Sequence, residues 1–270
     1  MERRTFIAAS TAAALTTPGA VAATGGAPAA EPGPGRPLLF ELRRYRLRTG
    51  TMATRFNGYV KDALLPALGR AGLGPIGAWN VQMGAESPTL YLLVPHATAE
   101  SVATLGDRID ADAEYRKAAS DLLALPSGDP PYLRCDSSLH TGVPTLPGID
   151  KLPPAVAVSS RIFELRTYRS HSEPASRKKI DMFEAKGELA VFKRDGMHTV
   201  FFSRDLVGEG LPSLTYMLAF ADAAAREKAW GVFRDDPEWA RLRALPGYAD
   251  AEVVSGITAA LLRPADYSQI

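Results

Sequence analysis

The sequence contains a single cysteine, Cys135, among 270 residues. A lone thiol excludes an intrachain disulfide and any metal site built from several cysteines. We expect Cys135 to be a partly buried thiol that packs as a small hydrophobic group. Charge of one sign is also lacking, because 31 Lys and Arg residues nearly balance 30 Asp and Glu residues. No dense basic run lies outside the N-terminus, so nucleic acid is not an expected partner.

Several motifs of common enzymes are missing. The sequence has no P-loop, no Rossmann glycine fingerprint, no nucleophile elbow and no HExxH segment. These absences argue against kinases, nicotinamide-dependent enzymes and the hydrolases that use such motifs. No apolar stretch reaches the roughly 20 residues that a membrane-spanning helix needs, so no transmembrane segment is expected.

The N-terminus has the pattern of an export signal. Arg3 and Arg4 stand just before Phe6 and a weakly apolar run, and the small residues 20–22 follow. Paired arginines before a weakly apolar run are typical of a twin-arginine signal, and an ordinary secretory signal is the alternative. We expect residues 1–30 to be the signal and the start of a tether, residues 31–37 to continue the tether, and the protein to be periplasmic or secreted.

The remaining sequence contains an internal repeat. Phe40–Arg46 (FELRRYR) recurs as Phe163–Arg169 (FELRTYR). The landmarks Gly72, Gly84 and Pro88 recur at the same spacing, within one residue, as Gly196, Gly208 and Pro212. Such repeats indicate a duplicated structural unit. We therefore expect a first domain at 38–136, a proline-rich linker at 137–160 and a second domain at 161–270.

Each repeat predicts the order β-α-β-β-α-β. Alternating apolar residues indicate a strand at 40–46, and an apolar stripe indicates a helix at 51–70 that Gly72 ends. Strands at 76–83 and 90–94, a helix and a last strand at 132–135 follow. The second repeat has the same pattern, with a helix predicted at 174–195. This is the ferredoxin-like arrangement of an α+β protein, and two such sheets can pack sheet to sheet around a shared interior.

Several segments resemble the bacterial NIPSNAP family. They are FELRTYR at 163–169, HTVFFSRDLVG at 198–208, DPEW at 236–239 and the end of the chain from 250. The likeness covers essentially the whole second repeat and, more weakly, the first, at 87–95 and 112–118. The resemblance implies a dimeric α/β barrel, here formed within one chain. It implies no particular reaction and no cofactor.

The repeated strand carries polar candidates for a binding site. Its side chains alternate between two faces, with Phe and Leu on one and Glu, Arg and Tyr on the other. If the apolar face packs on the helices, the polar face lies in the interior and holds a polar group of a ligand. The alternative is a structural ion pair that fixes the sheets. The candidates are Glu41, Arg43, Tyr45, Glu164, Arg166 and Tyr168.

His198 is a further candidate because Gly74 stands at the corresponding position of the first repeat. Imidazole suits acid/base chemistry and metal or haem ligation, and the alternative is a hydrogen-bonded histidine at a strand end. His96 and His140 look like exposed loop residues. Trp79 and Phe202 belong to an aromatic set that packs in the core or lines a cavity for an apolar small molecule.

The leading hypothesis is an exported, non-catalytic module that binds a small apolar molecule or a protein partner, without metal or cofactor. The alternative is a cofactor-free or haem-dependent oxidoreductase, such as a monooxygenase, that uses the cavity between the sheets; this rests on analogy between folds. The duplication already supplies a pseudo-dimer within the chain. The state of higher oligomerisation stays open.

Overall fold

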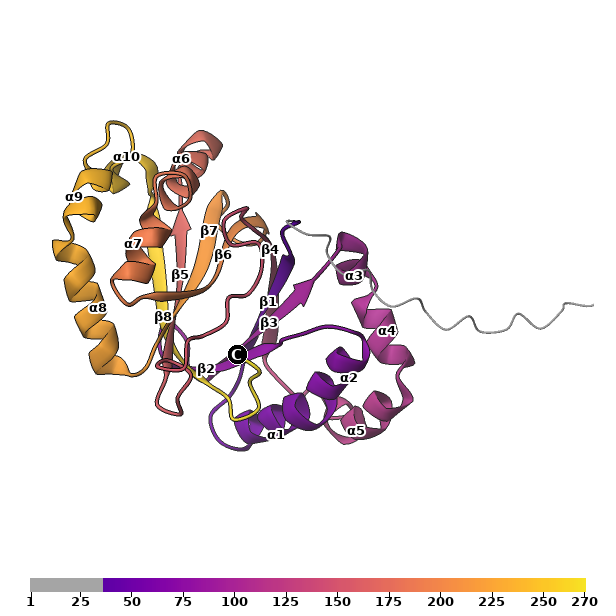
Figure 1. Cartoon of the computed structure of the whole chain (residues 1–270). Helices are drawn as coiled ribbons and strands as arrows, with labels where there is room; N and C mark the ends of the chain where they lie inside the picture. Colours follow the sequence, from indigo (N-terminus) through magenta and orange to yellow (C-terminus); the bar gives the residue numbers. More distant parts are fainter. Residues whose placement is uncertain (1–35) are drawn as a thin grey trace, which may run out of the picture.

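The computed structural model describes residues 36–270 (Figure 1). The predicted export signal, with Arg3, Arg4 and Phe6, lies outside the described residues. The first repeat consists of β1 (Leu39–Arg46), α1 (Thr51–Tyr59), the π-helical turn η1 (Val60–Leu64), α2 (Leu65–Arg70), β2 (Gly77–Met83), β3 (Thr89–His96), α3 (Ala99–Ala103), α4 (Leu105–Ala111), α5 (Ala113–Leu123) and β4 (Arg134–Gly142). The second consists of β5 (Ile162–Arg169), α6 (Glu173–Phe183), α7 (Glu188–Arg194), β6 (His198–Val207), β7 (Ser213–Phe220), α8 (Ala223–Asp235), α9 (Pro237–Arg243), α10 (Asp250–Val253) and β8 (Gly256–Pro264).

The strands form one closed antiparallel barrel in the order β1-β3-β2-β8-β5-β7-β6-β4. Each repeat contributes a four-stranded ferredoxin-like sheet. The two sheets join along two seams, one between β2 and β8 and the other between β4 and β6. The predicted α+β fold, with tandem ferredoxin-like domains forming a barrel within one chain, is confirmed. The seams show that the sheets also pair edge to edge.

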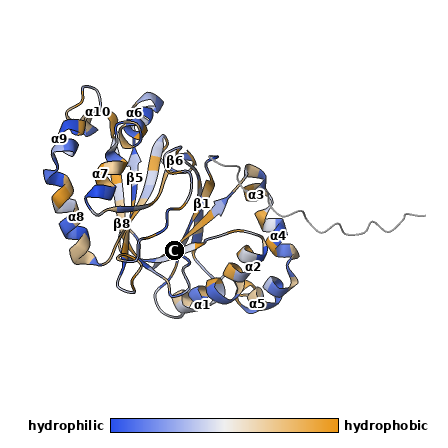
Figure 2. Cartoon of the chain, viewed as in Figure 1, coloured by the Kyte–Doolittle hydropathy of each residue, from blue (hydrophilic) through white to orange (hydrophobic). Residues whose placement is uncertain are grey.

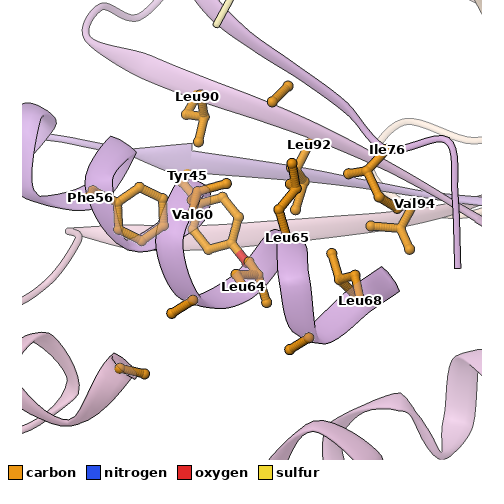
Figure 3. Packing of buried hydrophobic residues seen from close by; sticks show 14 of the residues in the cluster. Tyr45, Phe56, Val60, Leu64, Leu65, Leu68, Ile76, Leu90, Leu92 and Val94 are labelled. Atoms are coloured by element: carbon orange, nitrogen blue, oxygen red, sulfur yellow. The ribbon is translucent and has the colours of Figure 1, made fainter. Parts of the chain in front are cut away.

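The helices of the two repeats cover opposite sides of the barrel (Figure 1). They carry both hydrophilic and hydrophobic residues (Figure 2), as expected for elements with one face on a core. In the first repeat, Leu90, Leu92 and Val94 of β3 pack against Phe56 and Leu68 (Figure 3). None of the helices between residues 36 and 270 has the length and apolar character needed to span a bilayer.

The predicted helix at 51–70 is confirmed, with a local change of winding. Segments α1, η1 and α2 follow one another without a break. The π-helical turn Val60–Leu64 lies just before Pro66. Proline has no N–H to donate, and its ring crowds the carbonyl four residues earlier. A wider turn at this point relieves both problems without ending the helix.

The predicted helix at 174–195 is wrong in one respect, because two helices occupy this range. Helix α6 ends at Phe183 and α7 begins at Glu188. Between them Gly187 has φ +97°, a left-handed conformation that glycine adopts without steric cost. The chain therefore turns where the apolar pattern alone suggested a continuous helix.

The last strand of the first repeat was predicted at 132–135, and this boundary is also wrong. Strand β4 runs from Arg134 to Gly142 and takes up the start of the predicted linker at 137–160. Its sequence RCDSSLHTG contains few of the apolar residues that identify a strand. It forms because β1 pairs with it along its length and β6 pairs with its last residues, from Leu139 to Gly142, so main-chain hydrogen bonds hold this end on both sides.

The barrel interior is filled by the apolar faces of β1 and β5, contrary to the predicted direction of these strands. Phe40 and Phe163 lie in an apolar core within the barrel, while the Glu, Arg and Tyr side chains point toward the helices. Helix α8 supplies the partners that make this possible. Arg226 Nε and Trp230 Nε1 donate to Glu164 Oε2 at 2.7 and 2.8 Å, so the buried carboxylate is satisfied.

Candidate functional site

The barrel is hollow at the end where β1 and β5 finish. A cavity of about 480 Å³ lies there, within the usual size range of small-molecule sites. Leu42 and Leu165 belong both to its wall and to the apolar core of the barrel. They mark the level at which the packed interior gives way to the cavity. Beyond them the wall becomes polar, and Arg44, Thr167 and Arg169 lie near its mouth.

A histidine and an aspartate face each other in this wall. His140 of β4 is paired with Asp205 of β6 across the β4–β6 seam. His140 Nδ1 lies 2.7 Å from Asp205 Oδ1. Both side chains are largely buried, with 3% and 7% of their surface exposed. Low exposure strengthens this hydrogen bond relative to one in water.

The surroundings of Asp205 fix the tautomer of His140. Ser213 Oγ and Thr215 Oγ1 donate to Asp205 Oδ2 at 2.6 and 2.9 Å, and Thr167 Oγ1 lies 3.0 Å from Thr215 Oγ1. Asp205 Oδ2 accepts from two hydroxyls, so the carboxylate acts as the acceptor at Oδ1 as well. In the tautomer that matches this arrangement, Nδ1 of His140 carries the hydrogen and donates to Oδ1, and Nε2 is the acceptor.

Ser138 completes the chain of hydrogen bonds. Its Oγ lies 2.7 Å from His140 Nε2. Because Nε2 is the acceptor, the hydroxyl of Ser138 donates to it. Ser138 and His140 are two residues apart on β4, which places both on the inner face of the strand. Both line the cavity, and Ser138 lies nearer the mouth because β4 begins at that end, opposite Arg46.

The mouth of the cavity carries a neutralised cluster and one guanidinium without a carboxylate partner. Arg44 Nη2 and Arg46 Nη2 each lie 2.9 Å from Asp136 Oδ2, and Arg46 Nε lies 2.9 Å from Glu86 Oε2. The hydrogen bond from Arg44 lowers the pKa of Asp136. Arg169 also lines the cavity. Among residues 36–270, no carboxylate lies within ion-pair distance of Arg169.

The equivalent position on the opposite wall is apolar. His140 is paired with Phe40 of β1, and Leu262 is paired with the repeated residue Phe163 of β5. His140 and Leu262 are therefore equivalent. Across the β2–β8 seam, the partner of Leu262 is Val81. Only one seam of the described barrel thus carries the ionisable pair.

The residue equivalent to Ser138 on the opposite wall has no hydroxyl. Ser138 is paired with Leu42, and Ala260 with the equivalent Leu165. The cavity therefore has a wall with ionisable side chains at the β4–β6 seam and a wall of small side chains, mostly alanine, at the β2–β8 seam. An asymmetric molecule can bind such a cavity in one orientation.

Comparison with known families identifies the repeats. The family model described as NIPSNAP matches residues 40–125 and 163–269. These two stretches cover most of the chain and correspond to the two repeats. The chain belongs to the NIPSNAP family. No curated protein is significantly similar to it.

Solved structures similar to this NIPSNAP protein show how widely the fold occurs. A putative monooxygenase from Fusobacterium nucleatum has a TM-score of 0.57 and 8% identity, covering 85% of this chain and 93% of its own. Another, from Lactobacillus acidophilus, has a TM-score of 0.54 and 9% identity, covering 85% and 94%. An uncharacterised NIPSNAP-like domain protein from Burkholderia xenovorans has a TM-score of 0.37 and 18% identity, covering 41% and 90%. At such identities the likeness shows the fold alone.

In the second NIPSNAP repeat, the predicted site residues lie on the helix side of the sheet. Arg166 Nη1 donates to Glu164 Oε1 at 2.7 Å, and Nη2 donates to Tyr168 at 3.1 Å. Burial alone raises the pKa of Glu164, but hydrogen bonds from Arg226, Trp230 and Arg166 lower it overall. This trio does not line the barrel cavity.

In the first repeat the equivalent trio forms a similar cluster. Arg43 Nε and Nη2 donate to the two carboxylate oxygens of Glu41, each at 2.8 Å. His96 Nε2 lies 3.6 Å from Glu41 Oε2. Burial raises the pKa of Glu41, yet the nearby His96 and the hydrogen bonds from Arg43 lower it to about 2. His96 is buried, so its prediction as an exposed loop residue is wrong. Tyr45 packs against Phe56 in the helix-side core.

The other predicted candidates also lie away from the barrel cavity. His198 lines a separate groove beside Asp150 and Leu189, where burial lowers its pKa. Trp79 packs at 5.4 Å on Phe163 in the apolar core of the barrel. Phe202 packs on the helix side of the sheet.

Sequence reasoning missed Ser138, His140 and Asp205. The prediction of His140 as an exposed loop residue is wrong, because only 2% of the residue is exposed. One signal was available. Ser138 and His140 are two residues apart, which is the spacing of side chains on one face of a strand. Because this stretch is polar, it was predicted to be part of the linker.

The described residues offer no evident cofactor site in this cavity. Between residues 36 and 270, no group of three or more His, Cys, Asp or Glu side chains is placed to hold a metal ion. A haem iron takes a histidine nitrogen as axial ligand, and both ring nitrogens of His140 are already hydrogen-bonded. The wall does not fit a haem in this arrangement.

Proposed function

We propose that this NIPSNAP protein binds a small molecule in the open end of its barrel and that His140 accepts a proton from it. The observation that supports this most is the asymmetry of the cavity. A duplicated barrel has kept an apolar pair at one seam and carries a buried His–Asp pair at the other. Packing alone does not require this difference, because Leu262 and Val81 fill the equivalent space.

The chemistry of the wall suggests the class of ligand. Asp205 holds Nδ1–H of His140 and stabilises the imidazolium that forms when Nε2 takes a proton. The hydroxyl of Ser138 lies between Nε2 and the cavity and relays the proton. Leu42, Leu165 and Ala260 offer apolar surface to a ring or short chain. A small aromatic molecule with a weakly acidic hydroxyl, such as a phenol, meets both requirements.

A second candidate function is cofactor-free oxygenation of such a ligand. Two structures with this barrel, at TM-scores of 0.57 and 0.54, are described as putative monooxygenases. A phenolate formed at His140 is more electron-rich than the neutral phenol and is a better reductant of dioxygen. The ligand would be oxidised to a quinone: one oxygen atom would become the new carbonyl oxygen, and the other would leave as water with the O–H and ring C–H hydrogens of the phenol, which itself supplies all four electrons. This candidate needs no group beyond the ligand, dioxygen and the base.

The test uses p-nitrophenol, whose phenolate is yellow and whose neutral form is nearly colourless. In buffer acidic enough to keep the free compound neutral, we expect wild-type protein to bind it and to produce the phenolate colour. His140→Gln should bind it without the colour. His198→Gln makes the same change outside the cavity, in the separate groove, and should behave as wild type.

Calorimetry measures binding separately from ionisation. Absence of binding to the wild type overturns the proposal, and binding with equal colour in wild type and His140→Gln overturns the role of the histidine. Oxygen uptake with 1-naphthol, measured with an electrode, tests the oxygenase candidate. Uptake that depends on His140 supports it, and uptake equal to that without protein excludes it for this substrate.

A further inference from the structure

We infer that Ser138 is a nucleophile for acyl transfer, so that the same cavity cleaves small carboxylic esters. This inference rests on the proposed function, because it uses the same cavity and the same base. It goes further by giving the serine a covalent role. The family model and the solved structures assign no such activity.

The geometry is that of an activated serine. Ser138 Oγ, His140 and Asp205 are joined by two hydrogen bonds of 2.7 Å each. A serine hydroxyl is a weak nucleophile until a base within hydrogen-bond reach takes its proton, and the base needs a third group to orient it. Here Asp205 provides that orientation. The three residues lie on adjacent strands rather than on a nucleophile elbow, so a search for local motifs could not detect them.

The neighbouring hydroxyls have different partners. Ser137 Oγ donates to Glu41 Oε1 at 2.8 Å, Ser203 Oγ to the carbonyl of Thr215 at 2.8 Å, and Ser213 Oγ to Asp205 Oδ2 at 2.6 Å. These acceptors are carboxylate or carbonyl oxygens, which are weaker bases than imidazole. Ser138 Oγ also lies 3.4 Å from the carbonyl oxygen of Leu42, but it is the serine in this region whose hydroxyl is bound to an imidazole nitrogen, at the shorter distance of 2.7 Å.

The space around Ser138 permits a substrate to approach. A Cβ added at Gly208 would lie 3.1 Å from Ser138 Cβ, so the missing side chain leaves room beside the serine. Ser138 also lies on the mouth side of His140, which places the nucleophile between the base and an incoming molecule. The cavity of about 480 Å³ holds a small aryl or alkyl ester.

Arg169 is suited to stabilise negative charge that develops during the reaction. Arg169 lines the same cavity, and its guanidinium has no carboxylate partner among the described residues. A cation already in place at a developing oxyanion lowers the barrier without reorganisation. Arg44 and Arg46 are already neutralised by Asp136 and Glu86 and are less suited to this role.

The reaction balances without any further reagent. Ser138 Oγ attacks the ester carbonyl carbon while its proton passes to His140 Nε2, giving a tetrahedral oxyanion and an imidazolium. The C–O bond to the leaving group then breaks, and the imidazolium returns the proton to the departing oxygen. Water hydrolyses the acyl-serine with His140 as base, which releases the acid and regenerates the hydroxyl.

The test uses p-nitrophenyl acetate and the full-length protein. We expect a burst of p-nitrophenol, an increase of intact mass by one acetyl group, and an acetylated peptide that contains Ser138. Ser138→Ala should lose the burst and the adduct, with a rate lower on the order of 10³-fold if the three groups act as a unit. Asp205→Asn, at a positioning residue, should lower kcat far more than it raises KM.

Ser137→Ala is the matched control, since it removes a hydroxyl from the adjacent position on the outer face of β4. It should keep the burst and the adduct, and circular dichroism checks that all variants are folded. Acetylation confined to other residues, or none in the wild type, would overturn the inference. If the wild type and Ser138→Ala still bind p-nitrophenol in that case, the proposed function survives without the nucleophile.

Discussion

Glu188 Oε2 lies 3.3 Å from Lys179 Nζ in the space between the helices and the sheet of the second repeat. Asp250 Oδ1 lies 3.0 Å from the same ammonium group, and the Phe183 ring lies 4.8 Å from it. In the first repeat, the corresponding space is filled by Phe56 within an apolar core. The duplication has therefore diverged on the helix side as well as in the barrel.

This buried pair gives a prediction for pH dependence. Burial raises the pKa of Glu188 to about 7 from 4.5, although Lys179 opposes the shift. Between these values the folded protein holds a proton that the unfolded chain releases. The contribution to stability is therefore complete below pH 4.5 and is lost as the pH rises through about 7. We expect the melting temperature of the wild type to fall relative to that of Glu188→Gln over this range.

Thermal unfolding followed by circular dichroism at several pH values makes this measurement. Glu173→Gln, at an exposed position of α6, is the control and should follow the wild type. A difference between wild type and Glu188→Gln that does not change with pH would contradict the prediction.

Gly77 is predicted to be essential for packing within the barrel. A Cβ at this position would lie 1.8 Å from Trp79 Cη2, and Trp79 is fully buried. Overpacking of this kind costs about 1–3 kcal/mol or more. We expect Gly77→Ala to lower the free energy of unfolding by at least this amount in urea denaturation. Gly58→Ala, where an added Cβ meets nothing within 4 Å, should not be destabilising.

An aspartate caps the N-terminus of one helix in each repeat, α5 in the first and α9 in the second, so the two caps can be tested together. Asp112 Oδ1 accepts from the main chain of Tyr115 at 3.0 Å, and Asp236 Oδ1 accepts from that of Trp239 at 3.0 Å. Replacing either aspartate by alanine should cost about 0.5–2 kcal/mol of stability. Asparagine keeps the cap and should cost less. Asp112 also pairs with Arg70, and Asp236 with Arg194. Equal losses for alanine and asparagine would show that these ion pairs, rather than the caps, are responsible.

Export is predicted from residues 1–30, outside the described part of the chain. We expect an Arg3→Lys, Arg4→Lys double variant to accumulate in the cytoplasm, because the twin-arginine route reads both arginines. Cell fractionation and immunoblotting against a folded cytoplasmic marker measure this. Normal export of the variant would indicate the ordinary secretory route.

The fold was largely predictable because the signals that define it are local and repeated. The helix at 51–70 followed from its apolar stripe, and the duplication followed from Phe40–Arg46 and Phe163–Arg169. The sequence did not show which face of the repeated strand points toward the helices and which points into the barrel. Period-two alternation separates the two faces of a strand, but Tyr168 and Phe163 are both bulky and both suit a core. What decides between the faces is a partner on a distant helix, Arg226 for Glu164.

The candidate site could not be predicted for a related reason. A polar strand that lines a cavity has the composition of a loop, so β4 was assigned in part to the linker. The pairing of His140 with Asp205 depends on the register of a seam between the two repeats. That register is set by closure of the whole barrel, which no local pattern contains.

Closure of the barrel also determines how other chains can meet this one. Each strand of the described barrel has a neighbour on both sides along part of its length, so no strand offers a free edge along its whole length to an added strand. The helix surfaces, the linker and the mouth of the cavity are the larger surfaces open to a partner. Growth of an ordered aggregate by strand addition would first require one seam to separate, so the strength of the seams sets a barrier against it.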